Sequence, residues 1–210
     1  VLYRGVDGQR FKPNPSIIRA CRVRLLYLGG MQTYDPEQYG ALNTKGGHIL
    51  MEAWQSLDQE KINIEMTFAG PGNDPELLSH WHLGLNFPNR VTILGAIKPY
   101  AIPELILNHD LVVIPSLYEG LPNLANEAQA MGVPVIGSNA GGIPETVEHG
   151  HTGFIFERGD SNSLVNTIKA AVEDKSHLKK LGLNGRKKML QERSWEAFTE
   201  TLLEKYRSLR

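Results

Sequence analysis

The stretch Leu111-Val-Val-Ile-Pro-Ser-Leu-Tyr-Glu-Gly-Leu-Pro-Asn-Leu-Ala-Asn-Glu-Ala128 joins a predicted strand to a predicted helix. Its first part, Leu111–Pro115, is a continuous run of mainly branched apolar residues, which is typical of a strand covered on both faces. Gly120 and Pro122 then interrupt the strand, and the fixed φ of proline suits the first position of a helix. We therefore predict a buried strand, a short loop and a helix that opens near Pro122.

Two glutamates, Glu119 and Glu127, lie eight residues apart in this stretch. Glu119 falls on the predicted loop, and Glu127 falls one to two turns into the helix. Between them lie the N–H groups of the first helical turn, which have no partner within the helix and point to the space above the strand ends. Because helix N-termini attract anions, this arrangement favours binding of a phosphate-like group.

Short apolar runs alternate with helix-like segments over most of the chain, which is the pattern of a parallel α/β sheet. Strands are expected at Val23–Leu28, Ile62–Ala69, Val91–Leu94, Leu111–Pro115, Pro134–Gly137 and Gly153–Phe156. Helices are expected at Gly47–Ser56, Pro75–His82, Ile102–Asn108, Asn123–Met131, Ile143–His149, Ser161–Glu173, His177–Glu192 and Trp195–Arg210. Right-handed crossovers place helices on both faces of the sheet. The predicted fold class is α/β, with three layers and a parallel sheet of about six strands.

Two loops are expected to overhang the carboxyl ends of the strands, where ligands of open α/β sheets bind. One is the turn Ala69–Pro75, which combines glycines and prolines. The other is the stretch Met31–Thr44, which follows the first strand and has no clear period. Long loops of this kind in compact domains are often functional.

The charge composition does not point to nucleic acid, since 22 Lys and Arg residues balance 23 Asp and Glu residues for a net charge of -1. One basic cluster stands out in the predicted helix that ends at Glu192. Its members are Lys179, Lys180, Arg186, Lys187 and Lys188. Peripheral contact with anionic lipid and an ordinary solvated helix face are both open interpretations of this cluster.

The single cysteine, Cys21, cannot form an internal disulfide, which suits a reducing compartment. No apolar run reaches the roughly 18 residues that a membrane span requires, and no signal peptide is expected. The expected location is cytoplasmic, with peripheral membrane contact as the open addition. The start at Val1 rather than Met favours a fragment or a processed chain.

Several motifs in order resemble the carboxy-terminal, donor-binding domain of a GT-B-fold retaining glycosyltransferase of family 4, the glycosyl transferases group 1. They are Gly5–Pro13, Lys45-Gly46, Phe68–Gly72, Pro115–Ala128, Gly132–Val135, Ser138, Gly141–Glu145 and Ser194-Trp195. The resemblance implies a Rossmann-like fold that forms one half of an enzyme. It divides the chain into an entry segment from an absent N-terminal domain (1–22), a nucleotide-sugar-binding domain (23–192) and a closing helix (193–210).

The resemblance also implies roles for individual residues. Glu127 is expected to accept hydrogen bonds from the ribose hydroxyls of a nucleoside-diphosphate sugar, and Glu119 to lie near the transferred sugar. Lys45 is expected to supply a cation to the diphosphate, on which charge grows as the glycosidic bond breaks. The other expected donor-binding positions are Gly30, Gly70, Gly120, Leu121, Pro122, Asn123 and Leu124. No Asp-x-Asp metal motif is present, and no metal or other cofactor is expected, the nucleotide sugar being the donor substrate.

The chain departs from the family pattern in two ways. Met31 stands where many members carry an arginine directly after the first strand. The acceptor-binding half of a GT-B enzyme is absent from the sequence, so the chain is expected to bind nucleotide but to transfer sugar poorly. These departures keep a non-catalytic nucleotide-sugar-binding or assembly domain as the alternative function.

The residues taken alone leave other interpretations open. The glutamates could serve only to stabilise the start of a helix, and Lys45 could be an ordinary residue beside a helix. Paired carboxylates also occur in glycoside hydrolases, although the adjacent helix start favours a phosphate ligand over hydrolysis.

Overall fold

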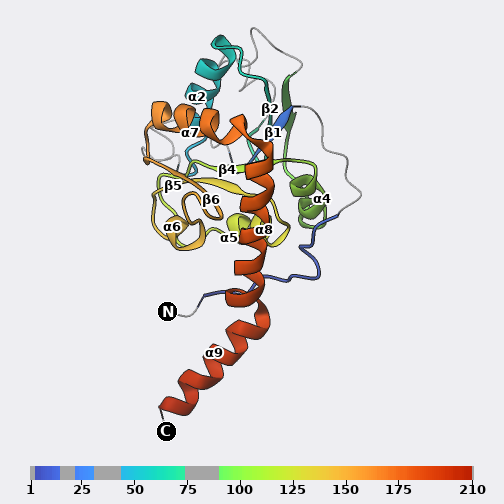
Figure 1. Cartoon of the computed structure of the whole chain (residues 1–210), viewed down its shortest axis with the longest axis vertical. Helices are drawn as coiled ribbons and strands as arrows, with labels where there is room; N and C mark the ends of the chain where they lie inside the picture. The colour runs from blue at the N-terminus through green and yellow to red at the C-terminus, as the bar shows by residue number, and fades with distance from the viewer. Residues whose placement is uncertain (1–2, 15–21, 31–43, 74–89, 210) are drawn as a thin grey trace.

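The computed structural model of the chain describes residues 3–14, 22–30, 44–73 and 90–209. Its centre is a six-stranded parallel sheet with the strand order β3-β2-β1-β4-β5-β6 (Figure 1). The strands are β1 (Val23–Leu28), β2 (Ile64–Ala69), β3 (Val91–Leu94), β4 (Leu111–Ile114), β5 (Val135–Ser138) and β6 (Gly153–Phe156). The chain moves outward in one direction from β1 to β3 and in the other from β4 to β6. The order therefore reverses between β1 and β4.

Helices cover both faces of this sheet, which confirms the three-layer prediction (Figure 1). The helical elements are α2 (Gly47–Gln59), η2 (Pro99–Ala101), α4 (Ile102–Leu107), α5 (Asn123–Ala130), α6 (Ile143–Thr146), α7 (Ser161–Glu173), α8 (Lys175–Glu192) and α9 (Trp195–Ser208). Successive strand residues enter opposite cores because side chains alternate along a strand. Leu25 packs in the core with α2 and α7, whereas Leu26 packs in the core with α4, α5 and α6.

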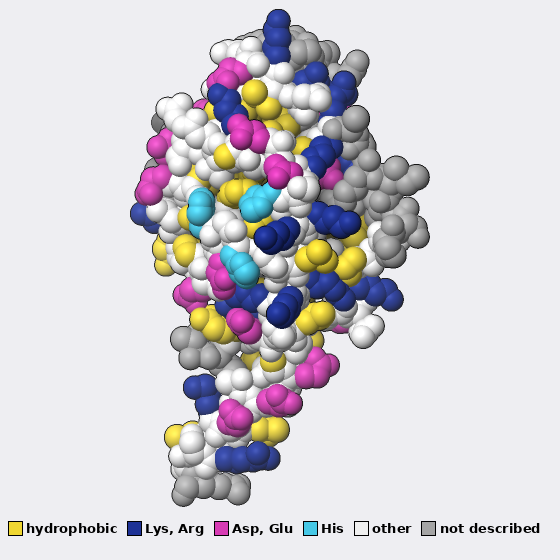
Figure 2. Space-filling model, in the orientation of Figure 1, with side chains coloured by type: hydrophobic (Ala, Val, Ile, Leu, Met, Phe, Trp, Pro, Cys, Tyr) yellow, Lys and Arg dark blue, Asp and Glu magenta, His cyan; other side chains and the backbone are white. Residues whose placement is uncertain are grey.

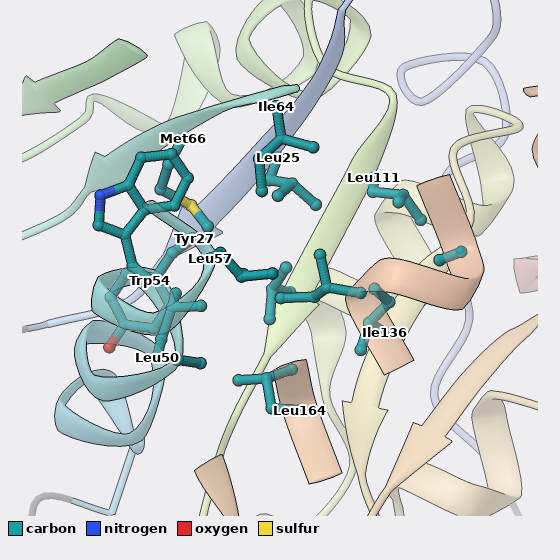
Figure 3. Packing of buried hydrophobic residues seen from close by; sticks show 14 of the residues in the cluster. Leu25, Tyr27, Leu50, Trp54, Leu57, Ile64, Met66, Leu111, Ile136 and Leu164 are labelled. Carbon is teal, nitrogen blue, oxygen red and sulfur yellow. The ribbon is translucent and has the colours of Figure 1, made fainter. Parts of the chain in front are cut away.

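The core beneath α2 contains the largest buried side chains. Trp54 and Leu50 of α2 lie beside Tyr27 and Met66 from β1 and β2 (Figure 3). Trp54 is 1% exposed and Leu50 is fully buried. Burying apolar area is the main favourable contribution to folding, so this layer holds α2 against β1 and β2.

Most predicted element bounds are confirmed. The strands Val23–Leu28, Val91–Leu94 and Gly153–Phe156 match residue for residue. The second strand begins at Ile64 instead of Ile62, because Lys61 adopts a left-handed φ of 58° and the Ile62 N–H returns to the Leu57 carbonyl.

One helix start and several helix ends differ from the prediction. Helix α5 begins at Asn123, as predicted, with Pro122 as its extended N-cap (ψ 104°) rather than as its first helical residue. Helix α8 begins at Lys175, because the Asp174 carboxylate accepts from the N–H groups of its first turn. Helix α6 ends at Thr146, because Val147 is extended. The helix expected at 75–82 and the loop expected at 31–44 fall almost wholly outside the described residues.

The N-terminal segment packs against the junction of α8 and α9. The Val6 N–H donates to the Arg193 carbonyl at 2.7 Å, and Val6 forms a bridge with Ser194. From this junction α9 extends away from the sheet (Figure 1). The division of the chain at residues 22 and 192 stays a prediction. Among the helices described, none is both long enough and apolar enough to cross a membrane.

Candidate functional site

A first hollow lies where the strand order reverses, between the carboxyl ends of β1 and β4. Its volume is about 200 Å³. The walls come from Tyr27–Gly29 after β1, Val113–Ser116 at the end of β4, and Leu121–Leu124 at the start of α5, with Lys45 and Glu119 beside them. Ligands of open α/β folds bind at this kind of reversal point, because the flanking loops diverge and leave space between them.

Hydrogen bonds hold the loop between β4 and α5 in place. Ser138 donates its hydroxyl to the Ser116 carbonyl at 2.5 Å. The Leu117 N–H donates to the Thr44 carbonyl at 2.8 Å, and the Gly142 N–H donates to the Gly120 carbonyl at 2.9 Å. The loop that carries Glu119 is thus fixed from both sides.

Two glycines allow neighbouring backbones to approach this loop. Gly46 and Gly141 have φ values of 66° and 50°, in the left-handed region that favours glycine. A Cβ atom on Gly46 would lie 1.8 Å from the Pro115 carbonyl oxygen, and one on Gly141 would lie 1.8 Å from the Glu119 carbonyl oxygen. At both positions glycine is required because any Cβ atom would collide with the backbone of the loop.

The two residues predicted to be catalytic, Lys45 and Glu119, lie together in the first hollow. Lys45 Nζ donates to Glu119 Oε2 at 2.8 Å, and Ser116 Oγ donates to the same oxygen at 3.4 Å. The Lys45 side chain is 49% exposed, whereas that of Glu119 is 16% exposed. The carboxylate is therefore anchored in the wall, and the ammonium group is accessible to a ligand.

The start of α5 presents unpaired backbone N–H groups to the first hollow. Among the residues that the structure describes, no side chain caps this helix, and Asn123 and Leu124 both line the hollow. The N–H groups of a first helical turn have no acceptor within the helix, so they and the helix dipole favour an anionic ligand here.

Glu127 lies in a second hollow of about 270 Å³, which shares Asn123 with the first. This second hollow is lined by Arg4–Asp7, Arg10-Phe11, Asn123, Asn126, Glu127 and Trp195. Burial raises the pKa of the Glu127 carboxyl above its ordinary value, and the nearby charges of Arg10 and Arg4 oppose this shift. The two glutamates of the motif thus belong to adjoining hollows rather than to one.

Three of the predicted glycine positions line neither hollow. Gly70 has a φ of 118°, and a Cβ atom on it would lie 2.5 Å from the Gly29 carbonyl oxygen. The Gly30 carbonyl accepts from the Tyr27 hydroxyl at 3.3 Å, and Gly120 supplies a carbonyl to Gly142. Gly29 lines the first hollow in their place. A donor-binding role for Gly30, Gly70 and Gly120 stays a prediction.

The motif pattern did not single out four residues that the structure brings to the two hollows. Ser116 contacts Glu119, and Arg4, Arg10 and Asn126 line the second hollow. The only sequence signal for Arg10 was its place in the motif Gly5–Pro13. In the parts of the chain that the structure describes, no group of three or more His, Cys, Asp or Glu residues could hold a metal ion.

A three-layer fold with a helix start beside the reversal of its parallel sheet is shared by the class of nucleotide-binding α/β proteins. Within that class, the glycosyl transferases group 1 family matches residues 38–188, which is more than half of the chain. The chain therefore belongs to the glycosyl transferases group 1 family. This finding confirms the resemblance that the motifs carried.

Named relatives and solved structures agree with this assignment. The chain is 32% identical over 170 residues to spore coat protein SA of Bacillus subtilis, covering 77% of this chain and 45% of that protein. It is 32% identical over 165 residues to the capsular polysaccharide biosynthesis glycosyltransferase CapM of Staphylococcus aureus, covering 77% and 42%. The structure of Alr3699/HepE from Anabaena in complex with UDP-glucose superposes with a TM-score of 0.79 at 27% identity, covering 99% of this chain and 57% of that one.

These comparisons confirm the predicted fold and enzyme family. The six-stranded parallel sheet with helices on both faces matches one half of GT-B glycosyltransferase structures. The chain spans less than half the length of the two curated relatives and somewhat more than half of the solved chain. Family membership is thus established for this half of the fold.

Proposed function

We propose that the chain is the donor-binding domain of a retaining glycosyltransferase that uses a nucleoside-diphosphate sugar. One observation carries the proposal: two adjoining hollows lie along the start of α5, one with unpaired helix N–H groups and Lys45, the other with Glu127. A diphosphate suits the first and a vicinal diol suits the second. An extended nucleotide sugar has both groups next to each other.

In the first hollow, Lys45 and the N–H groups of Asn123 and Leu124 would hold the diphosphate. Negative charge builds up on the diphosphate as the sugar leaves, so these groups would stabilise the transition state more than the ground state. Glu119 lies beside them and would contact the sugar while it keeps Lys45 in position. The proposal requires no metal or other cofactor.

In the second hollow, Glu127 would accept hydrogen bonds from the ribose hydroxyls. Within the described part of the chain, its carboxylate makes no hydrogen bond or ion pair, and it is only partly buried. A carboxylate in this state has both oxygens available for two neighbouring hydroxyl groups.

The acceptor would bind to a second domain, because GT-B active sites lie between two halves and the chain covers one. We therefore expect this chain alone to bind nucleotide but to transfer sugar poorly. A non-catalytic nucleotide-sugar-binding domain is the second candidate. The observation in its favour is that the Glu119 carboxylate is already paired with Lys45. Turnover by a two-domain protein that contains this chain would separate the candidates, since Glu119→Gln would lower turnover only in an enzyme.

Peripheral contact with anionic lipid stays a prediction. Only some residues of the basic cluster are exposed enough to make such a contact. In the basic cluster, Lys188 pairs with Glu148 and Arg186 donates to the Ala130 carbonyl, so both have structural partners. Lys and Arg side chains follow α8 on the face seen in Figure 2, with hydrophobic side chains among them. Lys179, Lys180 and Lys187 are the exposed members of the cluster.

Calorimetric titration of the chain with UDP, GDP and ADP tests the donor-binding proposal. At least one nucleotide should bind with a stoichiometry of one, and Glu127→Ala should weaken it roughly tenfold to hundredfold, because hydrogen bonds to a charged group are lost. Glu173→Ala, an exposed carboxylate at the end of α7, is the matched control and should bind like the parent. Failure to bind any of the three nucleotides would refute the proposal, and equal binding by Glu127→Ala would refute the ribose role.

A further inference from the structure

The second hollow holds charges of both signs that face each other without pairing. The side chains of Glu127 and Arg4 make no hydrogen bond or ion pair in the described part of the chain. Both Arg4 and Arg10 are close enough to Glu127 for their charges to act on its pKa. Because these opposite charges line one hollow without pairing, a ligand that has both hydrogen-bond donors and negative charge could contact both.

The backbone holds these cations at the hollow. Arg10 donates from Nη2 to the Pro99 carbonyl at 2.6 Å, which fixes one edge of its guanidinium group. The segment that carries Arg4 is tied to the α8–α9 junction through Val6, and a Cβ atom on Gly5 would lie 2.7 Å from the Trp195 ring. A preorganised cation such as Arg10 loses less entropy when an anion binds to it, whereas for Arg4 only the backbone is held in place.

Asn126 is the second, independent observation. This residue of α5 lines the hollow and is 3% exposed, yet no group in the described part of the chain donates a hydrogen bond to its buried Oδ1 atom. Buried polar atoms are nearly always satisfied in native proteins, so an unsatisfied acceptor on a residue that lines the hollow next to Glu127 is a position where a bound molecule can supply the donor. A hydroxyl group of a bound molecule is a donor of the right kind.

We propose that the second hollow binds the ribose-phosphate part of the donor, with Asn126 Oδ1 accepting from a ribose hydroxyl beside Glu127, and with Arg4 and Arg10 supplying positive charge to the adjoining phosphate. This inference rests on the proposed function and extends it to three residues of the hollow. The two arginines take over the charge that an arginine after the first strand would supply, where this chain has Met31. The N-terminal segment is then part of the nucleotide site.

A ligand series separates the phosphate contacts from the ribose contact. Whichever of UDP, GDP and ADP binds tightest is titrated beside its monophosphate and its nucleoside. The double variant Arg4→Gln/Arg10→Gln should weaken the diphosphate and the monophosphate about tenfold and leave the nucleoside unchanged, because only phosphate carries the charge that the guanidinium groups contact. The loss should shrink as salt is added.

Arg207→Gln is the matched control for the arginines, since Arg207 is exposed on α9 and lines neither hollow. It should bind all three ligands like the parent. Equal weakening of nucleoside and diphosphate by the double variant would overturn the phosphate role, as would no weakening of either. If the parent binds no nucleotide, the proposed function itself fails, and this outcome is distinct from both.

The Asn126 contact is tested with Asn126→Leu and with 2′-deoxy and 3′-deoxy forms of the same nucleotide. The parent should lose about tenfold in affinity for the deoxy form that lacks the contacted hydroxyl, and Asn126→Leu should lose much less, because its contact is already gone. The exposed Asn166→Leu on α7 should behave like the parent. A deoxy penalty of the same size in Asn126→Leu and in the parent would overturn the assignment. Because the comparison is between ligands, a small change in the stability of the variant does not alter it.

Discussion

The two hollows along α5 share Asn123 but treat charge in opposite ways. In the first, Lys45 and Glu119 form an ion pair on a loop that glycine contacts and hydrogen bonds hold in place. In the second, the side chains of Glu127 and Arg4 have no ion-pair partner among the described residues, and none of these residues donates to the buried Asn126 Oδ1 atom. The charged side chains of the first hollow pair with each other without a ligand, whereas those of the second hollow lack partners that a ligand can provide. Substitutions in the two hollows should therefore change stability with opposite signs.

The largest expected effect comes from the loop of the first hollow. Gly141→Ala should lower the free energy of unfolding by about 2–4 kcal/mol, because the new Cβ atom meets the Glu119 carbonyl in a left-handed backbone conformation. The melting temperature should fall by roughly 5–15 °C. Gly150→Ala is the control, since Gly150 has a φ of 74° with open space around it, and its cost should be about 1 kcal/mol. Equal losses in both variants would mean that the loop is not held by this contact.

The ion pair of the first hollow should have a smaller effect. A double-mutant cycle with Lys45→Met and Glu119→Gln, followed by urea unfolding without ligand, should give a coupling energy of about 0.5–1 kcal/mol. The pair is half exposed on the lysine side, so solvent screens it and the coupling should decline further in salt. A coupling near zero would show that Glu119 is held by Ser116 and the backbone instead.

The sequence predicts the strands well, because strands buried on both faces produce continuous apolar runs such as Leu111–Ile114. It also predicts the loop and helix that carry Glu119 and Glu127, because a glycine, a proline and a helix start lie within a few residues. Element ends were harder to predict. The start of β2 depends on the left-handed backbone of Lys61, for which a lysine gives no signal.

The separation of the two glutamates could not be predicted from the motif. The wall of the second hollow comes from Arg4–Asp7 and Trp195, whose association depends on the hydrogen bond from Val6 to Arg193. Arg4 and Trp195 lie at opposite ends of the sequence and are brought together by tertiary packing, which a local sequence motif does not reveal. Asn126 gave no signal beyond its place in the motif Pro115–Ala128, because the feature that draws attention to it is a buried acceptor without a donor in the described residues.

The smallest expected effect is on the pH dependence of stability, and it concerns Glu127 of the second hollow. Burial raises the pKa of Glu127 in the folded protein above its value in the unfolded chain, so the folded state binds more protons in the interval between these two values. The ionised carboxylate therefore lowers stability, fully above the folded pKa and not at all below the unfolded one. Glu127→Gln removes this cost and should be more stable than the parent by about 0.5 kcal/mol at pH 7, with the difference vanishing as the pH falls below the ordinary glutamate range.

The measurement is urea unfolding of Glu127→Gln, Glu119→Gln and the parent at pH 7 and pH 3.5, which compares the effect of one glutamate from each hollow on stability. Glu119→Gln should be less stable than the parent at pH 7, because it breaks the ion pair with Lys45. Glu127→Gln should be more stable there, because its carboxylate is half-buried and unpaired. A loss of stability in Glu127→Gln at pH 7 would mean that Arg4 or Arg10 already pairs with the carboxylate in solution. The charged side chains of the second hollow would then be paired like those of the first, and its ligand would have to compete with that pair.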